Sequence, residues 1–215
     1  MKTKFSIIIP AYNEERYIEN TLKSIPKNKE TEIIVVCNAC TDDTEIIAKK
    51  YAKVISIKEK NVSKARNIGA KKSKGNILIF LDADTLLTKN SLKKIESSLN
   101  YSIIGTCKVL SDNKKLKYSI AMKIKNLFLW FPWTSGIIYC DKKTFKKING
   151  FNENLTKKED SDFVKRAIKY GKFSIANTYV INSMRRFEKH GLIKISLFWI
   201  KEAIKPSKDE YKSVR

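Results

Sequence analysis

Residues 76–84 read NILIFLDAD, an apolar run that ends in two aspartates. Such a run is typical of a strand that is buried on both faces of a sheet. Similar apolar runs occupy residues 5–11, 32–37 and 54–57, and segments with the apolar spacing of a helix separate them. About the first 100 residues therefore predict an α/β fold: a doubly wound, mostly parallel, Rossmann-like sheet with helices on both faces.

The second half of the chain is less regular. Strands are expected at residues 102–110, 134–140 and 174–181, and an amphipathic helix at residues 191–205. No internal repeat, linker or low-complexity tract divides the sequence. We therefore expect a single domain over residues 1–215, with one lobe over about 1–110, a second over about 111–190, and the 191–205 helix after them.

The composition excludes several classes of protein. Hydrophobic residues make up 42% of the 215 residues, which excludes global disorder. Lys and Arg number 44 against 22 Asp and Glu, and the resulting charge of +22 favours polyanionic partners. Four cysteines are too few for a disulfide scaffold. The first apolar run stops at Pro10, too early for a signal peptide, so a cytoplasmic protein is expected.

Polar side chains follow the predicted strands, where ligands bind in open α/β sheets. Asp82 and Asp84 come directly after the strand over residues 77–81, and their spacing of two places both on one side if the extended geometry persists. Two carboxylates together with a substrate diphosphate would hold Mg²⁺ or Mn²⁺. The alternative is a solvated aspartate turn that caps the next helix.

A second acidic cluster, KEDSDF at residues 158–163, opens a predicted helix. Acidic side chains in a first turn can simply favour the helix dipole. The functional interpretation is a general base, because a hydroxyl that attacks an electrophilic carbon must lose its proton to a positioned group.

Four stretches together resemble family 2 glycosyltransferases of the GT-A fold. They are FSIIIPAYNEE at residues 5–15, EIIVVCNACTDDT at 32–44, ARNIGAKKSKGNILIFLDAD at 65–84 and GFNENLTKKEDSDF at 150–163. The resemblance implies metal-dependent transfer of a sugar from a nucleoside-diphosphate sugar, by direct displacement with inversion at the anomeric carbon. It also implies that the first lobe binds the donor and the second binds the acceptor and carries the base.

The same resemblance assigns roles residue by residue. The donor would contact Pro10, Ala11, Tyr12, Glu14, Asn38, Arg66, Asp82 and Ala83. Asp82 and Asp84 would bind Mn²⁺ or Mg²⁺, Asp160 would be the base, and Glu159 would contact the acceptor. The sequence departs from the family at Cys37 and Cys40, where many members carry Asp and Ser. These cysteines form a CxxC, which we interpret as small buried thiols rather than as a zinc or redox site.

Two further candidates lie near the end of the last predicted strand. Arg185 and Arg186 suit the oxygens of the donor diphosphate, although a basic surface turn is an equal alternative. His190 is the only histidine, and some GT-A enzymes place a histidine after the base as a further metal ligand. The alternative is a histidine without a functional role, which is the commoner case for a lone histidine.

The 191–205 helix and the aromatic segment LFLWFPW at residues 127–133 have two interpretations. They pack on the core, or they form an interfacial surface with lysines at lipid phosphates. The second favours peripheral association with the cytoplasmic membrane face and a lipid-linked or saccharide acceptor. A base at Asp160 favours a hydroxyl acceptor; if Asp160 only orients the acceptor, a polyprenyl phosphate remains open, as in enzymes resembling dolichol-phosphate mannose synthase.

Three other functions are alternatives to a glycosyltransferase. The charge of +22 would suit a nucleic-acid-binding protein, but its lysines are spread along the chain without a recognisable binding motif, so no nucleic acid is expected. A sugar-phosphate nucleotidyltransferase resembles this layout but opens on a Gly-rich loop, which PAYNEERY at residues 10–17 lacks. A binding module without turnover would not need Asp82, Asp84 and Asp160.

Overall fold

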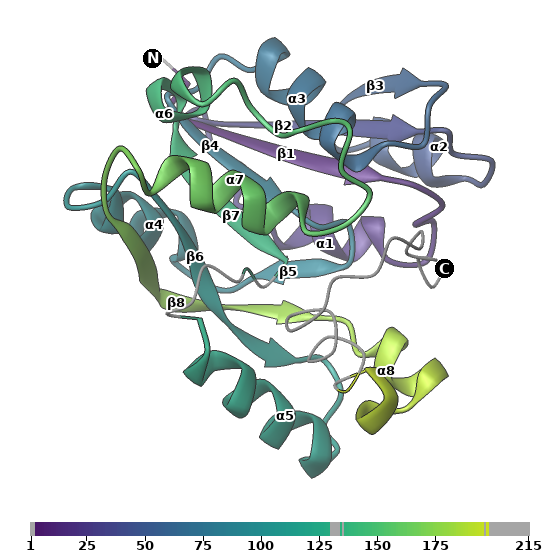
Figure 1. The fold of residues 1–215 in the computed structure, drawn as a ribbon. Helices are drawn as coiled ribbons and strands as arrows, with labels where there is room; N and C mark the ends of the chain where they lie inside the picture. Colours follow the sequence, from purple (N-terminus) through teal and green to yellow (C-terminus); the bar gives the residue numbers. More distant parts are fainter. Residues whose placement is uncertain (1–2, 130–133, 135, 196, 198–215) are drawn as a thin grey trace.

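The computed structural model describes residues 3–129, 134, 136–195 and 197 (Figure 1). In chain order the elements are β1 (Phe5–Ala11), α1 (Ile18–Ser24), β2 (Thr31–Asn38), α2 (Thr44–Lys49), β3 (Lys53–Ile57), α3 (Val62–Lys72), β4 (Ile77–Leu81), β5 (Thr85–Leu87), α4 (Ser91–Leu99), β6 (Ile104–Ser111), α5 (Leu116–Leu127), β7 (Ile137–Asp141), α6 (Lys142–Lys147), α7 (Glu159–Ala167), β8 (Phe173–Asn182) and α8 (Arg185–His190).

The strands form one sheet of eight, in the order β3-β2-β1-β4-β7-β6-β8-β5. The first four strands of that order are parallel, as the sequence predicts, and β6 and β8 are also parallel. β7 runs antiparallel to both of its neighbours, and β5 runs antiparallel to β8 at the edge. The α/β class is confirmed, and these antiparallel pairs make the sheet mixed beyond β4.

Alternate residues of β4 face two separate layers, as period 2 requires. Ile79 and Leu81 join the core that packs under α1, α4 and α5, whereas Leu78 and Phe80 join the core under α6 and α7. Phe80 meets the rings of Phe145, Phe151 and Phe163 on that second side. Helices therefore cover both faces of the sheet, as predicted (Figure 1).

Several elements differ from the sequence-based expectations. The strand expected at 134–140 begins only at Ile137, and β5, α5, α6 and α8 were not expected as separate elements. β5 and α8 are short, so neither shows a full period of apolar residues. Of the helix expected at 191–205, residues 192–195 and 197 are helical, and the remainder lies outside the described residues, as do residues 130–133 of the aromatic segment. No helix in the described ranges is long and apolar enough to cross a membrane.

Three loops next to the sheet's carboxyl edge hold non-glycine residues at positive φ. Asn13 follows β1 (φ 54°), Ala39 follows β2 (φ 62°) and Lys158 directly precedes α7 (φ 58°). Such conformations are disfavoured for residues with a Cβ and persist where surrounding contacts fix the backbone. The loops that carry the predicted site residues are thus held in specific shapes.

Candidate active site

The two aspartates after β4 lie in a turn that is fixed from both sides. The N–H of Asp82 donates to the carbonyl of Gly136 (2.9 Å), just before β7. The hydroxyl of Thr21, on α1, donates to the carbonyl of Ala83 (2.7 Å). These bonds anchor the backbone of the turn, so the Asp82 and Asp84 side chains leave it at fixed points.

Arg66, on α3, joins the two acidic clusters that the sequence keeps far apart. Its Nη2 lies 3.1 Å from Oδ1 of Asp82, and its Nη1 lies 2.5 Å from Oδ1 of Asp160 and 3.3 Å from Oε1 of Glu159. The Arg66 side chain is only 5% exposed, and its guanidinium lies over the ring of Phe151. One buried cation therefore binds three carboxylates and holds the start of α7 beside the turn after β4.

The environment of the 159–160 pair makes both carboxyl groups easier to protonate. Burial and the adjacent charge of Asp160 raise the pKa of Glu159 to about 7. Burial also raises the pKa of Asp160, although the charge of Arg66 opposes this rise. Thr134 donates its hydroxyl to Oδ2 of Asp160 (3.0 Å), which leaves this carboxylate oriented by two partners. A carboxylate with a raised pKa and a fixed orientation is suited to accept a proton.

Arg185, the first residue of α8, forms a second bridge. Its two Nη atoms contact the carboxylate of Glu14 at 2.6 and 2.8 Å, and Nη2 lies 2.9 Å from Oδ2 of Asp84. Its guanidinium also lies over the ring of Tyr17. The loop after β1, the turn after β4 and α8 are therefore joined through one side chain.

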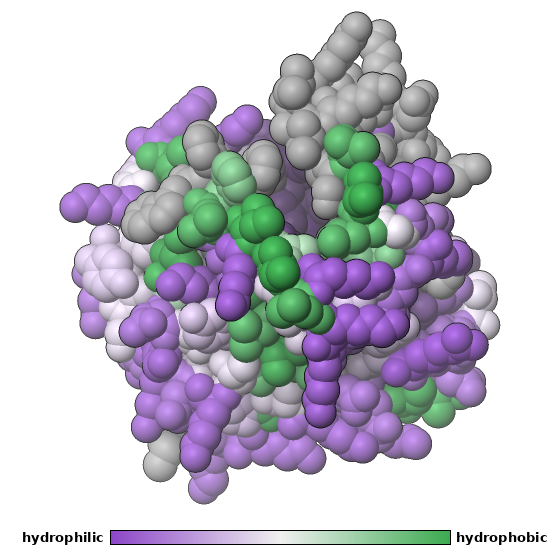
Figure 2. Space-filling view, turned by 90° about the horizontal axis from the view of Figure 1, so that it is seen from below, coloured by the Kyte–Doolittle hydropathy of each residue, from purple (hydrophilic) through white to green (hydrophobic). Residues whose placement is uncertain are grey.

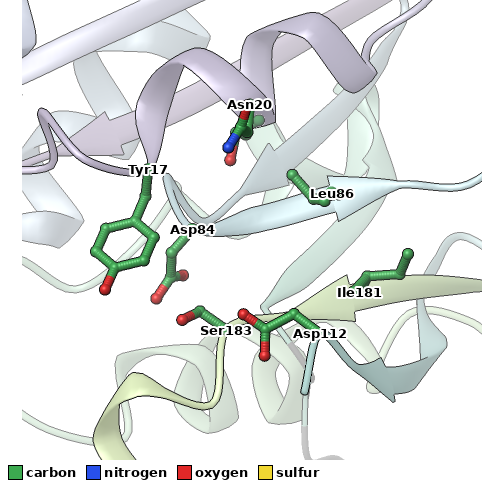
Figure 3. A pocket seen from close by; sticks show the side chains of 8 residues that line it. Tyr17, Asn20, Asp84, Leu86, Asp112, Ile181 and Ser183 are labelled. Carbon is green, nitrogen blue, oxygen red and sulfur yellow. The ribbon is translucent and has the colours of Figure 1, made fainter. Parts of the chain in front are cut away.

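Asp84 points into a small pocket of about 70 Å³ between α1, β5 and the end of β8 (Figure 3). Tyr17, Ser183 and Asp112 line the same pocket. Burial raises the pKa of Asp84 to about 6, and the positive charge of Arg185 limits that rise. Burial in this partly enclosed space thus disfavours the charged form of Asp84, and Arg185 stabilises it.

The loops after β1 and β2 lock together beside this pocket. The carbonyl of Ala11 accepts from Nδ2 of Asn38 (2.9 Å) and from the thiol of Cys40 (3.3 Å). The N–H of Glu14 donates to the hydroxyl of Thr44 (2.7 Å). Asn38 is buried, and its Nδ2 already donates to Ala11. A ligand would therefore be bound through the remaining hydrogen-bonding capacity of the Asn38 amide.

Tyr12 extends from the same loop and is half-buried, with the ammonium of Lys60 4.3 Å from its ring centroid. Pro10 is buried within β1. Cys37 is buried in the core, and its thiol pKa is raised, whereas the hydrogen bond from Cys37 lowers the thiol pKa of half-buried Cys40 to about 7. Both thiols are free; Cys37 is buried as the interpretation of small buried thiols expects, whereas Cys40 is only half-buried.

The structure adds Lys125, which no sequence pattern had indicated. Burial lowers its pKa to about 8, while Asp82 and Asp84 act to raise it and Arg186 lowers it further. Lys125 therefore shares the electrostatic environment of both site aspartates and of half-buried Arg186. Only the recognition of residues 116–127 as a helix would have revealed it, because Lys125 then falls on the side that faces the sheet.

His190 is exposed at the end of α8. Among the described residues no group of three or more His, Cys, Asp or Glu side chains is arranged to hold a metal by itself. Asp82 contacts Arg66 and Asp84 contacts Arg185, so the two carboxylates of this turn each have a cationic partner. Carboxylate oxygens suit a hard divalent cation that completes its shell with phosphate oxygens and water. The residues present therefore fit such a cation together with a diphosphate.

Comparison with known proteins adds independent findings. The family model described as glycosyl transferase family 2 matches residues 6–145, and a model described as the N-terminal domain of galactosyltransferase matches residues 122–190. The poly(ribitol-phosphate) beta-N-acetylglucosaminyltransferase TarS of Staphylococcus aureus is 35% identical over 101 residues, which cover 42% of this chain. The chain spans only 18% of the length of that relative.

Two solved structures are similar to this chain in fold. S. aureus TarS in complex with UDP-GlcNAc gives a TM-score of 0.68 at 24% identity and covers 84% of this chain and 58% of its own. The mannosyltransferase PcManGT from Pyrobaculum calidifontis, in complex with GDP-Man and Mn²⁺, gives 0.74 at 17% identity and covers 99% of this chain and 66% of its own. These likenesses confirm the fold expected from the sequence.

Proposed function

The chain belongs to glycosyl transferase family 2, and from this membership and its site we propose that it transfers a sugar from a nucleoside-diphosphate sugar to a hydroxyl acceptor, with inversion at the anomeric carbon. The observation that carries the proposal is Arg66, which contacts Asp82 on one side and Asp160 on the other. Inversion requires the leaving group and the attacking oxygen on opposite faces of one carbon. Because Arg66 contacts both Asp82 and Asp160, it holds the donor-side acid and the candidate base close to each other.

In this proposal Asp160 takes the proton of the acceptor hydroxyl as its oxygen attacks the anomeric carbon. The bond from that carbon to the diphosphate oxygen breaks, and the nucleoside diphosphate leaves with the electron pair. Thr134 and Arg66 hold the Asp160 carboxylate in place for this step. Glu159 lies beside it and contacts the acceptor. The raised pKa of Asp160 supports the role, because a more basic carboxylate accepts a proton more readily.

The donor would lie along the carboxyl edge of the sheet. Tyr12 and Asn38 would contact the base and ribose, with Pro10, Ala11, Glu14 and Ala83 shaping the surrounding wall. The cations near Asp84, namely Arg185, Arg186 and Lys125, would contact the diphosphate. Their fixed charges favour the leaving group most when its negative charge is fully developed, so they would lower the barrier rather than only tighten binding.

Asp82 and Asp84 would hold Mn²⁺ or Mg²⁺, which supplies charge neutralisation for the departing diphosphate. The structure of PcManGT, which is similar in fold, is a complex with GDP-Man and Mn²⁺. Arg185 would then exchange its contact with Asp84 for a phosphate oxygen while it keeps its two bonds to Glu14. His190 is a further candidate ligand for this site.

For the acceptor we propose a hydroxyl on a lipid-linked saccharide. A base at Asp160 has a purpose only if the acceptor carries a proton to remove, which a polyprenyl phosphate does not. The name of TarS describes transfer to poly(ribitol-phosphate), whose ribitol units offer hydroxyl groups.

Calorimetric binding of UDP, GDP and their sugars, with and without Mn²⁺, tests the donor half of the proposal. We expect one nucleotide to bind in a Mn²⁺-dependent manner, and Asp84→Asn to remove that dependence. Asp112→Asn is the matched control, because Asp112 lines the same pocket and its Oδ1 only accepts from the N–H of Met184. Failure of every nucleotide to bind, or unchanged Mn²⁺ dependence in Asp84→Asn, would contradict the proposed site.

A further inference from the structure

Helix α5 presents an apolar face to solvent. Leu116 and Leu127 are each 73% exposed, Ile120 is 47% exposed and Ile124 is 51% exposed. At 3.6 residues per turn these four side chains fall within an arc of about 80° on one side of the helix. A surface helix normally directs its apolar side chains inward, so this outer stripe is unusual.

The opposite side of α5 is firmly attached to the protein. Tyr118 and Met122 are buried in the main core. The side chain of Asn126 donates to the carbonyl of Val109 (2.9 Å) and accepts from its N–H (2.8 Å), which ties the end of the helix to β6. The outer stripe is therefore held on a fixed support and is not a consequence of loose packing.

Positive charge borders the stripe. Lys123 lies on one side of it and Lys117 on the other by helical geometry, and both are exposed. Ile193 (75% exposed) and Leu197 (60% exposed) add apolar surface beyond α8. A hydrogen bond between Asn113 and Glu188 links the segment before α5 to α8, and both helices lie at the same end of the molecule in Figure 1.

The view of that end in Figure 2 shows apolar side chains gathered in a band between hydrophilic ones. Such an apolar band with flanking lysines matches the two regions of a bilayer surface: the acyl boundary, and the anionic headgroups above it. The net charge of +22 adds long-range attraction to the same surface. A second copy of the chain fits less well, because a two-fold contact through this face would bring the bordering lysines of one copy toward those of the other.

We propose that α5 docks the protein on an anionic lipid bilayer, with Leu116, Ile120, Ile124 and Leu127 at the headgroup–acyl boundary and the bordering lysines on lipid phosphates. This inference rests on the proposed function, because membrane docking would serve a transferase whose acceptor is lipid-linked. The inner side of the same helix carries Lys125, within the field of Asp82 and Asp84. A lipid-linked acceptor held in the membrane would thus reach the site along α5.

Vesicle co-sedimentation tests the docking surface. The full chain is mixed with phosphatidylcholine vesicles that contain about a third phosphatidylglycerol, and with vesicles of phosphatidylcholine alone. We expect binding to the anionic vesicles, weaker binding to the neutral ones, and partial loss of binding as salt is raised. The triple variant Leu116→Ser, Ile120→Ser, Leu127→Ser should bind roughly tenfold or more weakly, because these side chains lose their apolar transfer energy.

The matched control is Ile46→Ser with Tyr101→Ser, two exposed positions (61% and 63%) on α2 and in the loop after α4, which should bind as the wild type does. Equal binding by the triple variant, no binding by the wild type, or a vesicle-free dimer that the triple variant dissociates would overturn the proposal. Mn²⁺-dependent nucleotide binding, measured on the same triple variant, separates the two hypotheses. Its loss in every form of the protein would count against the proposed function and leave the docking result intact.

Discussion

Arg66 Nη1 lies 2.5 Å from Asp160 Oδ1, a contact between residues 94 positions apart. It joins α3, which belongs to the parallel half of the sheet, to α7, which carries the second acidic cluster. Because Arg66 also contacts Asp82, this one guanidinium sets the distance between the donor-side aspartate and the candidate base.

Replacement of Arg66 by Met should destabilise the protein. Arg66→Met leaves Asp82, Glu159 and Asp160 without their shared cation, and the loss of a buried partner costs about 3 kcal/mol. Urea unfolding measures the change, with exposed Arg16→Met as the control. Arg66→Lys should recover part of the stability, since one ammonium cannot reproduce the fork that reaches all three acids. If Arg66→Met were as stable as the wild type, Arg66 would not stabilise the fold through its three carboxylate partners.

The raised pKa of Glu159 makes stability depend on pH. Between the ordinary value of 4.5 and about 7 the native state keeps a proton that the unfolded chain releases, so the free energy of unfolding falls as pH rises through that window. In Glu159→Gln this fall in the free energy of unfolding should be absent, because Gln does not titrate. Its melting temperature should exceed that of the wild type at about pH 8 and converge with it near pH 5. Exposed Glu30→Gln should show no such divergence, and a pH-independent difference for Glu159→Gln would refute the assignment.

Lys125 offers a test of the diphosphate subsite. Lys125→Met should weaken binding of the nucleoside diphosphate by about tenfold, the effect of one lost charge contact, and should change binding of the matching nucleoside far less. Lys123→Met, on the outer side of the same helix, is the control in a lipid-free assay. Equal losses for the diphosphate and the nucleoside would show that Lys125 acts through the packing of α5 instead.

Much of the fold follows from local sequence. β1, β2 and β4 are apolar runs buried by neighbours on both faces, and the residues directly after them lie at the sheet edge where the site forms. The pairing of acids with arginines was not visible in the same way. Arg66 with Asp160 and Arg185 with Glu14 are contacts between residues 94 and 171 positions apart, and no local pattern encodes them.

Helix α5 was not predicted from the sequence, and the reason is physical. Its sequence has apolar residues on both the inner and the outer side, so it lacks the single stripe that marks a helix packed on a core. The outer stripe that obscured the pattern is the surface proposed to dock on lipid. Lys125 was missed with it, since its position within the electrostatic influence of Asp82 and Asp84 depends on which side of the helix faces the sheet.

The most direct test of the central claim compares donor binding with transfer in Asp160→Asn. The variant should bind the nucleotide sugar as tightly as the wild type, while release of nucleoside diphosphate in the presence of lipid-linked saccharide acceptors should fall by about 10³-fold. Asp162→Asn, in the same first turn of α7 but paired with Arg166, should keep its turnover. Wild-type turnover in Asp160→Asn would contradict the claim that Asp160 is the base.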